Sequence, residues 1–144
     1  ANLYHTRTNL FSELINVSSK KDVYKILDIE TSEFWKSHYT FSKTSKVSKK
    51  ALTKSFIDLL VINTIIPLQF TYAKVQGRPI EDHIFNFMRQ IGVEKNSIVF
   101  KFLSLKPLEK HALMSQAFLQ LKQNYCDKNK CLQCAIGNSL IVKN

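Results

Sequence analysis

The sequence predicts an all-α fold: a single compact helical domain of about six or seven helices around one central apolar helix. Three observations favour helices over strands. Only 3 Gly and 3 Pro occur in 144 residues, too few for a loop-rich β fold. Apolar side chains recur at intervals of three and four residues along several stretches of the chain. The longest apolar run, residues 56–72, is too long for a strand and shows no alternation.

The N-terminal quarter of the chain predicts two helices. From Leu3 to Ile15 the apolar side chains follow the i, i+3, i+4, i+7 spacing of an amphipathic helix. Residues 17–19 break this pattern. Ser19 is placed to cap a short second helix that runs from Lys20 to Leu27.

Residues 28–41 predict a third helix, and they hold an unusual number of aromatic side chains. Thr31 or Ser32 is placed to cap it. Trp35, which is the only tryptophan, lies in this segment with His38. The segment ends where the most basic stretch of the chain begins.

The central helix is predicted from Ala51 to Ile65. It should end or kink at Pro67, because proline has no N–H to donate and its ring clashes with the preceding turn. Polar residues interrupt this run too often for a transmembrane helix, which needs about 20 nearly unbroken apolar residues, so we expect no membrane span. Asp58 should pair with Lys54 or Lys50, since a buried charge is costly unless it is paired.

The C-terminal half predicts three more helices. A turn at residues 76–79 precedes a helix from Ile80 to Ile91, and Gly92 is a natural end for that helix. Asn96 is placed to cap a short helix. A long helix should open at Pro107 and carry an apolar face as far as Tyr125.

The charge distribution suggests a polyanionic partner. Lys and Arg number 21 against 11 Asp and Glu, which gives a net charge of +10. Residues 42–55 hold five lysines and no acid, so they could bind a nucleic-acid backbone while neighbouring aromatic rings stack on bases. The alternative is a solvated basic loop with the tryptophan in the core. The residues predicted for nucleic-acid binding are Lys43, Lys46, Lys49, Lys50, Lys54, Trp35 and Tyr39.

The cysteines form the sharpest local motif. Cys126, Cys131 and Cys134 have the spacing C-x4-C-x2-C, which could aim three thiolates at zinc or at an iron–sulfur cluster. A fourth ligand is then needed. His38 is preferred for it, because His111 begins the helix that Cys126 ends and lies about 20 Å away along the axis. The alternatives are redox or disulfide use of these thiols, or small buried core residues.

No catalytic signature is present. The isolated glycines exclude a glycine-rich phosphate loop, and no G-x-S-x-G motif occurs, so no catalytic residue is predicted. Three clustered cysteines do not form a secreted disulfide framework, and no signal peptide is visible. We therefore expect a cytoplasmic protein without enzymatic activity of its own. The abrupt start at Ala1 suggests a fragment of a longer protein.

Three stretches carry a family resemblance: FWKSHYTF, LTKSFIDLLVINTIIPLQFTYAKVQG and SQAFLQLKQNYCDKNKCLQCAIGNSL. They resemble an uncharacterised bacterial family known only as a domain of unknown function. Its members are longer, and this chain is similar to their C-terminal helical part. The resemblance implies a binding or scaffolding module whose partner is an upstream domain of the same protein. A structural metal-binding domain and a helical cover of an upstream enzymatic domain are the alternatives.

Overall fold

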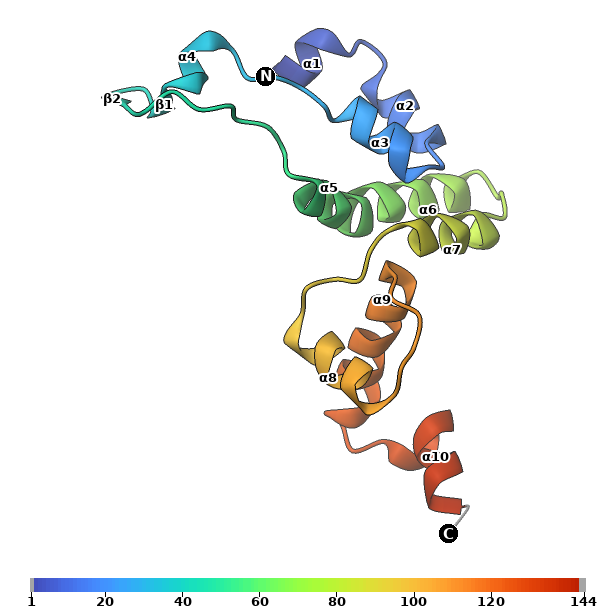
Figure 1. Ribbon diagram of the computed structural model, residues 1–144. Helices are drawn as coiled ribbons and strands as arrows, with labels where there is room; N and C mark the ends of the chain where they lie inside the picture. Colours follow the sequence, from blue (N-terminus) through green and yellow to red (C-terminus); the bar gives the residue numbers. More distant parts are fainter. Residues whose placement is uncertain (1, 143–144) are drawn as a thin grey trace. The chain divides into compact units, whose positions relative to one another are not determined.

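The computed structural model describes residues 2–142, and it is mostly helical (Figure 1). The predicted all-α class is confirmed, with one small two-stranded sheet within the described residues. The contacts along the chain divide it into two compact units, Ala1–Phe87 and Met88–Asn144. A single domain over residues 1–144 stays a prediction.

The described residues contain ten α-helical segments, more than the six or seven predicted. Several are short, because the first predicted helix is split in two and the third shrinks to one turn. In chain order the elements are α1 (Asn2–Thr6), α2 (Leu10–Asn16), α3 (Lys20–Ile26), α4 (Glu33–Lys36), β1 (His38–Thr40), β2 (Lys43–Thr44), α5 (Lys54–Leu60), a π-helical turn (Val61–Ile65), α6 (Ile66–Val75), α7 (Glu81–Gln90), α8 (Ser97–Leu105), α9 (Ala112–Leu121), a second π-helical turn (Lys122–Cys126), a 3₁₀ turn (Cys131–Gln133) and α10 (Ala135–Val142).

Two of the predicted capping residues, Ser19 and Asn96, cap their helices, whereas Ser32 stands at the N-cap of α4 without a side-chain capping bond. The Ser19 hydroxyl accepts a hydrogen bond from the Asp22 amide at 3.1 Å, and α3 begins at Lys20. Asn96 caps α8 in the same way. The start predicted at Pro107 is wrong: α9 begins after His111, whose ring Nδ1 accepts the amide hydrogen of the third residue of the helix.

The central helix continues well beyond its predicted end. A continuous helix of 22 residues runs from Lys54 to Val75. Its π-helical turn closes with a bond from the Ile66 amide to the Val61 carbonyl, five residues back. Pro67 is the second residue of α6, which begins where this turn ends. A π turn holds one residue more than an α turn, so the missing N–H of proline falls where the regular pattern is already interrupted.

This long helix bears on the question of a membrane. Within the described residues it is the one helix that is long and apolar enough to cross a membrane by length and composition, with a mean hydropathy of 1.5. The sequence argument against a membrane span therefore fails on length and composition. Core helices of soluble proteins have the same properties, and 39% of its most apolar window is buried. A soluble protein is compatible with this helix, and the cytoplasmic location stays a prediction.

In the first unit, α2 packs on α6 and α3 packs on α5. Asp58 of α5 accepts hydrogen bonds from Lys20 Nζ at 3.1 Å and from the Tyr24 hydroxyl at 2.8 Å. The predicted pairing with Lys54 or Lys50 is therefore wrong, because the partner comes from α3. Burial lowers the pKa of Lys20, but the hydrogen bonds to Tyr24 and Asp58 outweigh it, so that pKa is raised. The buried apolar residues of this unit are Val17, Val23, Ile26, Leu27, Ile57, Val61, Ile62, Ile65, Ile66, Ala73, Ile84 and Phe87.

A glutamine lies among these apolar residues. Gln69 of α6 is 1% exposed. Its side-chain nitrogen donates to the carbonyl of Leu14 at 2.8 Å and to that of Val17 at 2.7 Å. Its side-chain oxygen lies 3.3 Å from Nε2 of His83 on α7. One amide therefore ties the end of α2 and the following turn to α6, and links α6 to α7.

In the second unit, α8 packs on α9, and the rings of Phe102 and Phe118 stack with centroids 4.9 Å apart. The segment before α8 is tied to α9 through Glu94. Its amide donates to the buried Ser115 hydroxyl at 3.0 Å, and its carboxylate accepts from Gln116 at 3.0 Å. These bonds supply the polar part of a small helical core.

Replacing Gln69 by Leu should lower the free energy of unfolding by about 2 to 3 kcal/mol, because the carbonyls of Leu14 and Val17 lose their donor in a buried place. Urea denaturation followed by circular dichroism measures this change. Asn63 offers a matched control: its amide also bonds a carbonyl on the same long helix, but the residue is exposed. Asn63→Leu should change stability by less than about 0.5 kcal/mol. Equal losses of unfolding free energy in both variants would show that the buried Gln69 amide stabilises the fold no more than an exposed one.

Candidate functional site

The predicted third helix is mostly wrong, because residues 38–44 form a hairpin instead. Strands β1 and β2 are antiparallel, with His38 opposite Thr44 and Thr40 opposite Lys43. The chain then runs back alongside α4: the Ser45 amide donates to the Ser37 carbonyl at 2.6 Å, and the next such bond joins residues 48 and 36. We call this hairpin together with the segment that leads to α5, residues 38–53, the basic hairpin.

An aromatic cluster joins α4 to the basic hairpin. The rings of Phe34 and His38 are stacked with centroids 4.0 Å apart. Trp35 meets Phe34 edge-on at 5.0 Å and meets Phe41 at 5.1 Å. His38 Nδ1 also bonds the Phe34 carbonyl at 2.8 Å. Trp35 and His38 are therefore held within this cluster.

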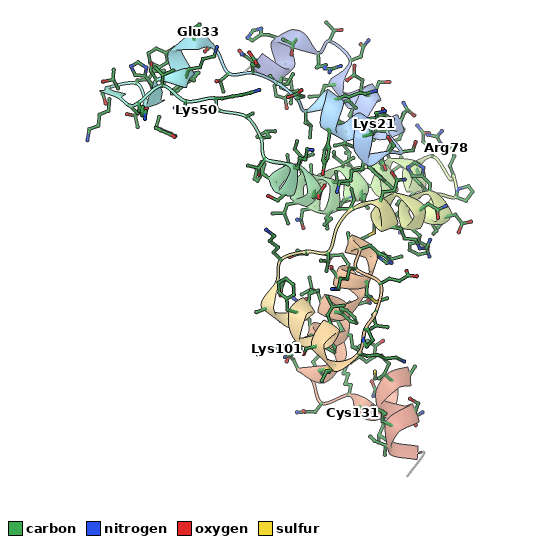
Figure 2. The ribbon with its side chains drawn as sticks, viewed as in Figure 1. Lys21, Glu33, Lys50, Arg78, Lys101 and Cys131 are labelled. Carbon is green, nitrogen blue, oxygen red and sulfur yellow. The ribbon has the colours of Figure 1, made fainter. Side chains whose placement is uncertain are left out.

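The predicted lysines fall into two groups. Lys43, Lys46 and Lys49 are exposed, and none of them forms an ion pair with another residue of the described chain. Lys50 is half-buried (labelled in Figure 2): its Nζ lies 3.5 Å from the centroid of the Tyr39 ring and donates to a backbone carbonyl at 2.6 Å. Lys54 belongs to the first turn of α5. Lys50 therefore holds the hairpin in shape, and the first three lysines face outward.

Two rings of the basic hairpin are strongly exposed. Tyr39 is 73% exposed and Phe41 is 81% exposed. Phe41 was absent from the residues predicted for binding, although it lies between Tyr39 and the first lysine. The signal that could have revealed the hairpin is the β-prone sequence Tyr39-Thr40-Phe41, followed by a serine at the turn.

The predicted metal ligands are not gathered into a site. Within residues 2–142 no group of three or more His, Cys, Asp or Glu is placed to hold a metal ion. Cys126 and Cys131 are exposed, whereas Cys134 is buried. His38 belongs to the first unit and the cysteines belong to the second. Zinc or an iron–sulfur cluster has no geometric support here and stays a prediction.

The cysteine segment nevertheless has a defined backbone. The Cys134 amide donates to the Cys131 carbonyl at 3.2 Å across the 3₁₀ turn, and α10 begins after Cys134. Gly137 lies close to this turn. A Cβ added there would stand 2.5 Å from the Cys131 carbonyl oxygen, which no real packing allows. Gly137 is therefore required for α10 to approach the cysteine turn.

Fold and site together define a mostly helical protein with an exposed basic and aromatic hairpin. The chain belongs to the family described as Protein of unknown function (DUF2851), whose model matches residues 1–97. The resemblance stated from the sequence is thereby confirmed as to the family. The match includes the basic hairpin and the long central helix, whereas the cysteine segment lies beyond it. Bacterial origin and a C-terminal place in a longer protein stay predictions.

Comparison with curated proteins and with solved structures found no match to this chain. The family description gives no activity. The function therefore has to be argued from the chain's own residues.

Replacing Gly137 by Ala should expose the buried thiol of Cys134, because the added methyl group forces the Cys131 turn and α10 apart. In the reduced protein, two thiols should react quickly with an aromatic disulfide reagent and one slowly, since access controls this chemistry. In Gly137→Ala the slow thiol should react several-fold faster. Gly92→Ala is the control, because its added Cβ meets nothing within 4 Å. An unchanged slow rate would refute the argument for close packing.

Proposed function

We propose that this chain is a helical binding module that holds single-stranded nucleic acid on the basic hairpin. The observation that carries the proposal is the combination of three exposed lysines with two exposed aromatic rings within the basic hairpin. Ammonium groups attract backbone phosphates whatever the base sequence, and aromatic rings stack on unpaired bases. A duplex keeps its bases stacked inside, so exposed rings favour a single strand.

Lys43, Lys46 and Lys49 supply the electrostatic part of the proposed binding. Residues 42–55 contain no Asp or Glu, so no carboxylate within the stretch itself repels a phosphate. The spacing of three residues places the ammonium groups along one short length of chain. A polymer with regularly spaced charges can meet all three at once, whereas a small anion meets only one or two.

Tyr39 and Phe41 supply the stacking part. A fully buried aromatic side chain removes about 150–250 Å² from water, so two rings this exposed represent apolar surface that a base would partly cover. Lys50 lies over the Tyr39 ring at 3.5 Å. A cation over one face of the ring leaves the opposite face for a base, and it strengthens the site's attraction for phosphate.

Salt dependence tests the electrostatic part. Binding of a short oligothymidylate, measured by fluorescence anisotropy, should weaken as salt rises from about 50 to about 200 mM, with a slope near −0.7 for each phosphate contact. Replacing Lys43, Lys46 and Lys49 together by Gln should flatten the slope by about 2, because about three contacts are lost.

The control for this experiment removes three exposed lysines from the second unit. Replacement of Lys101, Lys106 and Lys110 by Gln changes the net charge by the same amount. This variant should keep most of the slope. Equal flattening by both triple variants would mean that the whole basic chain attracts the oligonucleotide, and the hairpin would lose its assigned role.

A second substitution tests the stacking part. Phe41→Ser should reduce affinity at fixed salt by about 1 to 3 kcal/mol without changing the slope, because it removes a ring and no charge. Val47→Ser is the matched control, since Val47 is also exposed, at 71%, on the same segment. If both changes weaken binding equally, general apolar contact rather than base stacking explains the effect.

We also propose that the long central helix docks on another part of the same protein. The supporting observation is that this helix exposes three large apolar side chains, Phe56, Leu59 and Phe70, which are 48%, 40% and 41% exposed. Phe56 and Leu59 are three residues apart and share one side of the helix, and Phe70 follows the π-helical turn. Replacing Phe56 and Phe70 by Ser should weaken binding to the separately purified upstream polypeptide and leave thermal unfolding of this chain unchanged. Unchanged binding would remove this role.

A further inference from the structure

A second feature of the first unit is an open pocket beside the turn between α6 and α7. Its volume is about 250 Å³. The polar part of its lining comes from Asn16, Gln69, Tyr72, Arg78 and His83, and the apolar part comes from Ile15, Ala73, Pro79 and Ile80. Arg78 is labelled at this turn in Figure 2. None of these residues belongs to the basic hairpin.

The buried amide fixes one wall of this pocket. The side-chain nitrogen of Gln69 donates both of its hydrogens to backbone carbonyls. The side-chain oxygen of Gln69 is therefore the atom that faces His83. An amide oxygen only accepts, so Nε2 of His83 carries the hydrogen in this 3.3 Å contact. The imidazole is thereby held in one orientation beside the cavity.

The backbone of the turn places a guanidinium at the other wall. Gly77 has φ = +65°, a left-handed conformation that glycine adopts without strain. The next residue is Arg78, whose amide donates to the Ala73 carbonyl at 3.0 Å and so anchors it to the end of α6. Its guanidinium carbon lies 5.9 Å from the centroid of the Tyr72 ring. The turn thus aims this side chain toward the pocket.

Arg78 has no carboxylate partner in the part of the chain that the structure describes. The nearest acid along the chain, Glu81, is used elsewhere: its carboxylate accepts the Ile80 amide at 3.0 Å. Hydrogen bonds from its own amide and from that of Ile80 lower the pKa of Glu81. Glu81 lines the neighbouring pocket, which also includes Arg78 and Lys74, and does not line this one.

We propose that the pocket binds a small organic anion, with its anionic oxygens on the Arg78 guanidinium and its apolar body against Ile15, Ile80 and the Tyr72 ring. Guanidinium presents a planar fork of donors that suits carboxylate and phosphate alike. A volume of about 250 Å³ lies just below the usual range for ligand pockets, which restricts the ligand to the size of one ring with one charged group. This site is independent of the nucleic-acid proposal.

Isothermal titration of the chain with benzoate, phenyl phosphate and benzamide tests the site. Benzoate or phenyl phosphate should bind, and the stronger of the two identifies a carboxylate or a phosphate site. Benzamide, which has the same body without the charge, should bind at least about tenfold more weakly, as one lost charge-assisted bond requires. Binding of neither anion, or equal binding of benzamide, would overturn the proposal.

Two variants of Arg78 locate the binding. Arg78→Gln should weaken the anion at least about tenfold, and Arg78→Lys should restore part of the loss because it keeps the charge but not the fork. Since Arg78 is exposed, both variants should fold, which circular dichroism checks. Lys43→Gln is the control and should leave this titration unchanged. Anion binding that survives Arg78→Gln in a folded protein would place the ligand elsewhere and reject the pocket.

Discussion

The first unit depends on one buried amide. Gln69 has almost no exposure to water, and a polar side chain at that depth costs free energy unless its atoms are hydrogen-bonded. Gln69 makes three such bonds: one to the Leu14 carbonyl within α2, one to the Val17 carbonyl just after it, and one to His83. Apolar contacts between α2 and α6 are non-directional and would allow the helices to slide. These hydrogen bonds fix one register between segments that are more than 50 residues apart in the chain.

Features that depend on sequence neighbours could be predicted from the sequence. Ser19 and Asn96 cap the helices they were expected to cap, because a capping side chain needs only amides two or three residues away. Pro67 shows the limit of this reasoning. Whether a proline ends a helix depends on the turn before it, and the π-helical turn here is not visible as a pattern of residue types. The partner of Asp58 was missed for a related reason, since Lys20 lies 38 residues away.

The candidate site shows the same contrast between features that residue types reveal and features that depend on the fold. The lysines and Tyr39 of the basic hairpin were named from the sequence, because charge and aromatic character are properties of the residues themselves, whereas the exposure of Tyr39 and Phe41 is a property of the fold. Their arrangement was not predicted. The hairpin is held by hydrogen bonds such as that from the Ser45 amide to the Ser37 carbonyl. The prediction of a helix over residues 28–41 does not include such bonds. At the cysteines the spacing suggested a metal cluster, but within the described residues no group of three or more His, Cys, Asp or Glu is placed to hold a metal ion, and the site stays a prediction.

The two anion sites that we propose differ in the kind of partner they suit. On the basic hairpin the charges are ammonium groups on flexible stems, exposed and repeated along the chain, an arrangement that tolerates any geometry of phosphates. At the pocket the charge is a single guanidinium beside an imidazole that Gln69 holds in place, within a bounded volume. Repeated charges on flexible side chains suit a polymer, whereas one charge within a bounded pocket suits a small molecule. Both sites lie in the part of the chain that the family model matches, whereas the cysteine segment does not. The binding chemistry we propose is therefore carried by the first unit.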